Sequence, residues 1–368
     1  MSSIYEMRLH KLRDYLEKEH IDIALITNPT NIYYFTGFLS NPHERFMALI
    51  VDTLHARESM IVPGLDLEAA EQHSIVRDLV PCSDSENPYI LLKNKVGRTR
   101  IGTLGLEKKA ISLYRVERLQ ELFSDLQSTD IEPFINQERL VKSEQDLVSI
   151  RRAVDIAEKV LESTVQKVKV GMLEQELAAE LEYKIRKFGG DKPAFESIIL
   201  TGKRSCMPHG KPGAYPIREN DFLLFDMGVY ADGFCSDITR TFLIGEGTKE
   251  QETIYETVLT ANLAAIQAVK VGLPYGIIDQ TGRGIIAEKG YGAYFNNRIG
   301  HGIGLDLHED PSINGDNGML IGPGHVFTIE PGIYLPSLGG VRIEDDVYVQ
   351  PNGQVEVLTH YPKQLRRL

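Results

Sequence analysis

Cysteine and long apolar runs are scarce in this sequence of 368 residues. Its three cysteines, Cys82, Cys206 and Cys235, are too few and too scattered for a disulfide framework or a cysteine zinc site. We therefore expect a reduced protein of the cytoplasm. No segment reaches the roughly 18 consecutive apolar residues of a membrane span, and no apolar stretch behind the N-terminal charges indicates a signal peptide.

Positive charge is also in deficit, with 40 Lys and Arg against 52 Asp and Glu and a formal net charge of −12. Nucleic acids and anionic membranes are bound by basic surfaces, so neither is expected as a partner. With 42% apolar and 25% charged residues, the composition is that of a globular chain and excludes disordered, collagen-like and coiled-coil proteins. The length exceeds what one ordinary core holds, which predicts two domains.

The first part of the chain alternates short apolar runs with helical patterns. The expected strands are 21–26, 47–51, 59–62 and 100–104, and the expected helices are 5–19, 65–73 and 111–125. This alternation predicts an α/β layer domain. We interpret the aromatic and polar segment 28–45 as a functional or interface loop, with an ordinary connection as the equal alternative.

A change of pattern near residues 131–142 marks the second part. Ser143 and Asp146 have the spacing of a capping box, and apolar residues then recur every three or four positions up to Val168. This predicts a long helix that faces a core. We place the boundary between about 128 and 142, which gives domains of 1–135 and 136–368.

The second part contains a weak internal repeat. The sequence Val168–Gly171 recurs as Val269–Gly272, each time between two helical patterns, and Phe225–Tyr230 is echoed by Ile329–Tyr334. We interpret this as two helix–helix–strand units related by a pseudo-twofold axis. Each unit would bring a strand carboxylate to a central cleft.

Acidic residues in these strands predict a metal site. Asp226 lies within an apolar strand, where a carboxylate is costly unless it is paired or metal-bound. The turn at 231–233, with Gly233 suited to a bulge, is expected to bring Asp237 nearly opposite Asp226, with Cβ atoms about 5 Å apart. Such a pair needs a cation between its charges, although a structural salt bridge is the better reading of Asp226 alone.

Three further residues extend this set. His301 is flanked by glycines that permit close backbone approach and leave the imidazole open, Glu330 ends a strand before Pro331, and Glu344 lies in another strand. Four carboxylates and one imidazole suit hard or borderline divalent metals. Because the acids carry more charge than one ion neutralises, we expect two ions.

In order and local context, these five residues resemble the metal ligands of the Xaa-Pro dipeptidase (prolidase) and aminopeptidase P branch of the pita-bread-fold metallopeptidases, peptidase family M24. The resemblance covers about 143–360, and residues 28–37 resemble part of a creatinase-type N-terminal domain. It implies an α/β N-terminal domain followed by an α+β pita-bread (creatinase/aminopeptidase-like) catalytic domain.

The resemblance also implies a role for each ligand. Asp226 would hold one metal through both oxygens, Asp237 and Glu344 would bridge two ions, and His301 with Glu330 would complete the second site. Manganese is the first expectation for both divalent ions, with cobalt or zinc as alternatives.

Four residues are expected around the substrate. His209, His308 and Arg342 fall on family positions there and are expected to be catalytic, with the two histidines also binding substrate. The competing readings are a loop histidine for His209 and an ion pair with Asp346 or another acid for Arg342. Arg298, three residues before His301, would bind the substrate's carboxylate or, equally, form a structural salt bridge.

The implied function is hydrolysis of an N-terminal Xaa-Pro bond by metal-activated hydroxide, with Glu330 carrying a proton to the leaving nitrogen. The compact length favours a dipeptidase over an aminopeptidase P acting on longer Xaa-Pro peptides. The alternative from another class is a non-catalytic pita-bread binding protein. Relatives form homodimers, so we expect a homodimer in which His43 or Arg45 reaches the neighbouring cleft.

Overall fold

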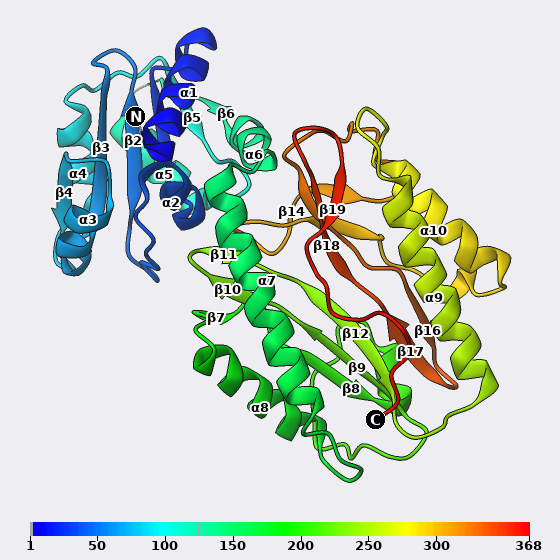
Figure 1. Cartoon of the computed structure of the whole chain (residues 1–368). Helices are drawn as coiled ribbons and strands as arrows, with labels where there is room; N and C mark the ends of the chain where they lie inside the picture. Colours follow the sequence, from blue (N-terminus) through cyan, green and yellow to red (C-terminus); the bar gives the residue numbers. More distant parts are fainter. Residues whose placement is uncertain (1–2, 124) are drawn as a thin grey trace. The chain divides into compact units, whose positions relative to one another are not determined.

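The computed structural model describes residues 3–123 and 125–368, and the chain divides into two compact units, Met1–Glu138 and Arg139–Leu368 (Figure 1). Each unit has its own buried apolar clusters. Within the described ranges, no helix combines the length and hydropathy needed to cross a bilayer.

The first unit is built on a six-stranded mixed sheet with the strand order β4-β3-β2-β1-β5-β6. Its strands are β1 (Ile23–Ile26), β2 (Ala48–Asp52), β3 (Arg57–Pro63), β4 (Leu79–Cys82), β5 (Thr103–Leu106) and β6 (Gln127–Asp130). Its helices are α1 (Ile4–Lys18), α2 (Pro29–Thr36), α3 (Leu67–His73), α4 (Pro88–Val96), α5 (Leu113–Leu122) and α6 (Glu132–Leu140), with a 3₁₀ turn η1 (Gly64–Asp66). All four residues of β1 are buried, as expected for a strand covered on both faces.

The expected alternation of strands and helices is confirmed here, with shifts at the ends. The fourth expected strand, 100–104, is β5 and begins only at Thr103. In α1, Leu12 and Leu16 are buried as the helical spacing requires, but Met7 is 48% exposed and lies outside the core. Met7 therefore lies on the polar side of the helix, and its assignment to the apolar face was wrong.

The loop interpretation of 28–45 is wrong for its first half, because residues 29–36 form α2. The Asn28 side chain accepts a hydrogen bond from the Thr30 N–H at 2.9 Å, and Pro29 is the first helical residue. Gly37 ends the helix with a φ of 79°. The aromatic residues that suggested an interface include Phe35, which is fully buried. Residues 37–45 do lie outside helices and strands.

The second unit begins with a helix pair and a group of short strands. These elements are α7 (Glu144–Val165), α8 (Glu174–Lys187), β7 (Lys192–Pro193), β8 (Ile198–Thr201), η2 (Gly202–Cys206), β9 (Phe222–Met227), β10 (Val229–Ala231), β11 (Phe234–Cys235) and β12 (Ile238–Leu243). The predicted capping box is confirmed, since Ser143 N donates to Asp146 Oδ2 at 2.9 Å and Asp146 N to Ser143 Oγ at 3.2 Å. The helix ends at Val165, three residues before the end predicted at Val168.

A second helix pair and further strands complete the unit. They are α9 (Lys249–Ala268), α10 (Gly276–Glu288), η3 (Gly292–Tyr294), β13 (Gly300–Gly302), β14 (Glu309–Ile313), β15 (Val326–Ile329), β16 (Gly332–Leu335), β17 (Gly339–Arg342), β18 (Asp345–Val349) and β19 (Val355–Val357). The sheets have the orders β11-β10-β7, β12-β9-β8, β14-β13-β15-β18-β19 and β16-β17. In Figure 1, α7 and α9 run along the outer sides of the strands of this unit.

The predicted repeat is confirmed in the order of the elements and in its turns. After α7, Gly171 has a φ of 91° and donates its N–H to Ile217 O at 2.8 Å. After α9, Gly272 has a φ of 84° and donates its N–H to Ile321 O at 2.9 Å. A positive φ is tolerated by glycine, which explains why this residue ends both copies of the short motif.

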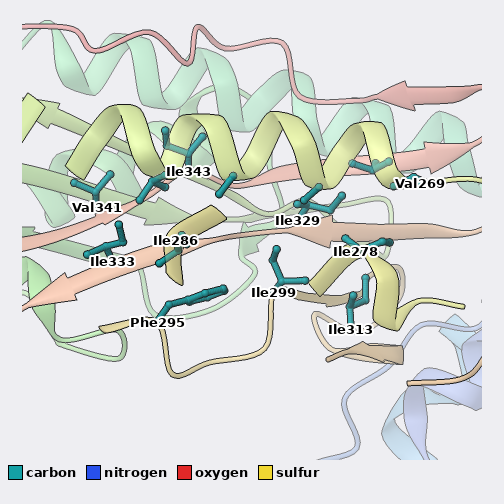
Figure 2. Packing of buried hydrophobic residues seen from close by; sticks show 14 of the residues in the cluster. Val269, Ile278, Ile286, Phe295, Ile299, Ile313, Ile329, Ile333, Val341 and Ile343 are labelled. Atoms are coloured by element: carbon teal, nitrogen blue, oxygen red, sulfur yellow. The ribbon is translucent and has the colours of Figure 1, made fainter. Parts of the chain in front are cut away.

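Each helix pair buries an apolar cluster against the strands. One cluster is centred on α7 and α8 and includes Phe225 and Met227 of β9. The other is centred on α9 and α10 and includes Ile329, Val341 and Ile343, which Figure 2 shows in the packing beneath α9. The residues that directly precede Glu330 and Glu344 are therefore fixed by hydrophobic packing, although the strand expected around Glu344 is interrupted at residues 343 and 344, between β17 and β18.

Candidate metal centre and active site

The hairpin of β9–β12 determines how its two aspartates face each other. Its turn consists of Asp232 and Gly233, with φ values of 52° and 82°, the pattern of a two-residue type I′ turn. This turn inserts no bulge, so Asp226 pairs with Thr239. The expectation that Asp237 stands opposite Asp226 is therefore wrong by two residues, and the two are diagonal neighbours on one face.

Asp237 is buried and only partly hydrogen-bonded. Its backbone N–H donates to Asp346 Oδ2 at 3.1 Å, which fixes the main chain. Its Oδ1 is buried without a hydrogen-bond partner in the described part of the chain. His301 Nε2 lies 3.7 Å from Asp237 Oδ2 and 3.6 Å from Glu330 Oε1. A buried carboxylate with one oxygen unpartnered and the other facing an imidazole is an arrangement that a bound cation would satisfy.

The glycines that flank His301 permit a close approach of three strands. A Cβ on Gly300 would lie 2.0 Å from Thr328 O, and a Cβ on Gly302 would lie 2.0 Å from Asp310 O. These contacts exclude any side chain at either position. The imidazole is buried rather than open, and its ring packs edge-on against His308 at 4.3 Å between centroids.

Glu344 and Asp226 are linked through Thr239 and Arg342. Thr239 Oγ1 donates to Glu344 Oε2 at 2.6 Å and accepts from Arg342 Nε at 3.0 Å. Arg342 Nη1 donates to Tyr334 Oη at 2.9 Å, and its Nη2 forms an ion pair with Asp226. The alternative that Arg342 pairs with an acid is thus observed, with Asp226 as the partner. Neither Thr239 nor Tyr334 was predicted as a site residue, and only their closeness to predicted residues in the sequence could have indicated them.

All nine residues expected at the site line one cavity of about 410 Å³ in the second unit. They are His209, Asp226, Asp237, Arg298, His301, His308, Glu330, Arg342 and Glu344. The residues that the sequence did not single out are Phe195, Ile198, Pro208, Asn297 and Leu307. Three of these five are direct neighbours of predicted residues, whereas Phe195 and Ile198 had no sequence signal.

Within this cavity the candidate ligands are not equally close. Atoms of Asp237, His301 and Glu344 lie within 4.8 Å of one another, which makes a group able to hold a metal ion. Glu330 approaches this group through His301, and Asp226 is turned toward Arg342. The structure therefore brings three predicted ligands tightly together and places the other two beside them.

Burial and crowding shift the protonation of these groups. Burial raises the pKa of Asp237 and of Glu344 well above the usual range, and neighbouring carboxylates raise both further. Burial likewise raises the pKa of Glu330 to about 7, although Arg342 opposes the shift. Burial and the nearby His308 lower the pKa of His301 to about 3, so its ring is neutral and able to bind a metal. The donor set thus fits divalent cations.

Arg298 is the remaining charged group of the cavity. Its Nη1 donates to Ser312 Oγ at 3.3 Å, a long hydrogen bond. Over residues 3–123 and 125–368, no ion pair involves Arg298, so the structural salt bridge considered from the sequence is not observed. The guanidinium is left with donors for a ligand in the cavity.

A strand-built cavity with buried carboxylates and a histidine, preceded by a separate α/β unit, defines a two-unit metallohydrolase. The profile described as "Metallopeptidase family M24" matches residues 148–351, and "Creatinase/Prolidase N-terminal domain" matches residues 8–141. The chain belongs to metallopeptidase family M24. The expected α/β and α+β pita-bread domains are thereby confirmed, and the non-enzymatic class is disfavoured.

Individual relatives cover 97% or more of the chain. The Bacillus subtilis protein named "Putative dipeptidase YkvY" is 40% identical over 361 residues, covering 97% of this chain and 99% of that protein. The prolidase from Thermococcus sibiricus has a TM-score of 0.93 at 34% identity, with 100% of both chains covered. The X-Pro aminopeptidase from Thermotoga maritima has a TM-score of 0.89 at 33% identity, covering 98% of this chain and 99% of that one.

The raised carboxyl pKa values predict that metal binding releases protons. A carboxyl group whose pKa is about 7 is largely protonated below that pH, and a metal must displace the proton. We expect Mn²⁺ affinity to fall about tenfold per displaced proton for each pH unit below 7. Calorimetric titrations in buffers of different ionisation enthalpy count the released protons. Glu330→Gln should release fewer, and a pH-independent affinity without proton release would contradict the crowding described above.

Proposed function

We propose that this protein is a two-metal Xaa-Pro dipeptidase, which releases proline from dipeptides. The observation that carries the proposal is the composition of a single cavity. It combines three buried carboxylates, the partly buried Glu330 and a neutral imidazole with an arginine that has no acidic partner in the described chain. The names of the prolidase relatives support the same substrate class.

Five residues would hold the two divalent ions. They are Asp226, Asp237, His301, Glu330 and Glu344. Oxygen donors with one imidazole suit manganese best, with cobalt or zinc as alternatives. Bound divalent ions supply a water of lowered pKa and polarise the scissile carbonyl.

The side chains of the cavity supply the remaining chemistry. Glu330, which lines the cavity, would pass a proton from the attacking water to the leaving nitrogen. His209 and His308 line the same cavity and can donate hydrogen bonds to the carbonyl oxygen as it gains charge. Arg342 orients Asp226 through their ion pair. The ring of the substrate proline, whose nitrogen carries no hydrogen in the peptide bond, would pack against apolar wall residues such as Ile198.

The carboxylate of the substrate distinguishes the two related activities. A dipeptide ends in the proline carboxylate, which Arg298 can bind through parallel hydrogen bonds. An aminopeptidase P acts where that carbonyl is part of a further amide. The similarity to the Thermotoga maritima X-Pro aminopeptidase supports aminopeptidase P activity as the second candidate function. The Arg298 side chain without an acidic partner favours the dipeptidase.

Substitution of Arg298 separates these candidates. Arg298→Ala should raise KM for an Xaa-Pro dipeptide about 10- to 100-fold, the effect of losing hydrogen bonds to a charged group. The KM for a tripeptide Xaa-Pro-Yaa should change much less, because its proline carbonyl is uncharged. Steady-state kinetics with both substrates measure the ratio. Equal losses would assign Arg298 a structural role and would remove the support for a dipeptidase.

Substitution of Asp237 tests the metal site itself. Asp237→Ala removes a proposed bridge between both ions and should lower kcat by roughly a thousandfold, or about 4 kcal/mol. Asp232→Asn in the same hairpin is the matched control, because Asp232 forms an exposed ion pair with Arg152. The control should retain metal content and turnover. Appreciable hydrolysis by Asp237→Ala would exclude the proposed ligand set.

We also propose a cytoplasmic homodimer in which the segment 37–45 reaches the partner's cleft. His43 is exposed, whereas Arg45 already binds Asp84 through a hydrogen bond of 2.8 Å, which favours His43 as the contributor. Sedimentation velocity should show a dimer at concentrations where the enzyme is active, and His43→Ala should reduce kcat/KM without changing the sedimentation coefficient. A fully active monomer would refute this arrangement.

A further inference from the structure

A buried charged cluster lies behind the cavity, on the opposite side of the strands that carry the candidate ligands. Asp345 directly follows the cavity residue Glu344, and Arg240 directly follows Thr239, which hydrogen-bonds Glu344. Neither Arg240 nor Asp345 lines the cavity, and within β12 the side chains of Thr239 and Arg240 point to opposite faces. Arg240 Nη2 and Asp345 Oδ1 lie 2.8 Å apart, with exposures of only 1% and 0%. This ion pair is part of the protein interior.

Arg240 holds the main chain at Thr239 and at the cavity residue Glu344. Its Nη1 donates to Thr239 O at 2.9 Å and to Glu344 O at 2.5 Å. Its Nη2 also donates to Tyr361 O at 2.9 Å. One guanidinium therefore joins the segment that carries Thr239 to the segment that carries Glu344, so the two cannot separate without breaking buried hydrogen bonds.

Asn262, in the middle of α9, makes the corresponding contacts at the two glutamates. Its fully buried Nδ2 donates to Ile329 O at 3.2 Å and to Ile343 O at 3.2 Å. These isoleucines directly precede the two cavity glutamates, and Figure 2 shows both in the apolar cluster next to α9. Nδ2 also lies 3.0 Å from Asp345 Oδ2, and Lys363 Nζ lies 2.6 Å from the same oxygen. The amide thus connects both glutamate segments to the ion pair.

We propose that Asn262, Arg240, Asp345 and Lys363 form a positioning network for metal binding. These residues touch neither substrate nor metal, and act by holding the backbone of Glu330 and Glu344. Carboxylates crowded without a cation repel one another, so they would move apart unless their backbones were fixed. This proposal rests on the proposed function, because the expected effect of the network is a higher affinity of the cavity for the metal ions.

A merely structural network would have a different signature. Any buried hydrogen-bonded amide contributes to stability, so its removal lowers the melting temperature whatever the site does. Gln251 offers a matched control on the same helix. Its side chain is also buried, and its Nε2 donates to Asn220 O at 2.7 Å, away from the residues that line the cavity. Comparison of the two amides separates stability from metal affinity.

The experiment compares Asn262→Ala with Gln251→Ala in the full-length protein after removal of metal by a chelator. Melting temperature is measured without metal, and Mn²⁺ affinity is measured by calorimetry. Both variants should melt at lower temperature, but only Asn262→Ala should bind Mn²⁺ about 10- to 100-fold more weakly. Excess Mn²⁺ should then restore its turnover, because the cavity surface is unchanged.

Unchanged Mn²⁺ affinity in Asn262→Ala, or equal losses in both variants, would overturn the network. If Asn262→Ala does not fold, Lys363→Met tests the same network from its edge, and it should weaken Mn²⁺ binding in the same direction. Unaltered affinity in that variant would also reject the proposal. If the unmodified protein binds no Mn²⁺, the proposed function fails, and the positioning role fails with it.

Discussion

The architecture of the second unit depends on the cost of holding four carboxylates together away from water. Asp226, Asp237, Glu330 and Glu344 line one cavity, and burial raises the pKa of each. Like charges in a region of low dielectric must be neutralised by protons, by a basic side chain or by cations. Arg342 forms an ion pair with Asp226. The negative charges of the other three carboxylates must be neutralised by protons or by cations. This requirement links the fold to metallopeptidase chemistry.

Several features of the backbone around the cavity keep these carboxylates close together. Gly300 and Gly302 allow β13 to lie against its neighbours closely enough to bury His301 among the acids. The repeated helix pairs press the strands together from outside, and the hydrogen bonds of Arg240 and Asn262 tie adjacent segments behind the cavity. Each constraint removes a way for the acids to separate. The fold therefore holds the candidate metal ligands close together.

Much of this site could be predicted from the sequence, because its signals are local. Carboxylates in apolar strands and a histidine between glycines are unusual enough to identify five residues that do line one cavity. The contacts between segments were not predictable in the same way. The register of Asp226 depended on whether the turn at Gly233 contained a bulge, and the structure has a two-residue turn instead. The partner of Arg342 depended on that register as well.

The first unit shows the same limit. Four of the six strands of its sheet were found from apolar runs, with end shifts such as that at Thr103, whereas β4 and β6 were not predicted and α2 was taken for a loop. The helix signals were present in Asn28, Pro29 and Gly37, but eight residues with several aromatics also fit an exposed interface segment. The burial of Phe35 in the folded protein decides between a packed helix and an exposed interface segment. Local capping chemistry therefore deserves more weight than composition in such short segments.

The proposed hydrolysis of Xaa-Pro dipeptides requires two divalent ions in this cavity. Titration of Mn²⁺ into the chelator-treated protein, with proline release from an Xaa-Pro dipeptide as the readout, measures how many ions are needed. We expect no release without metal and a plateau at about two ions per chain. A plateau at about one ion per chain, or the absence of proline release at any Mn²⁺ concentration, would contradict it.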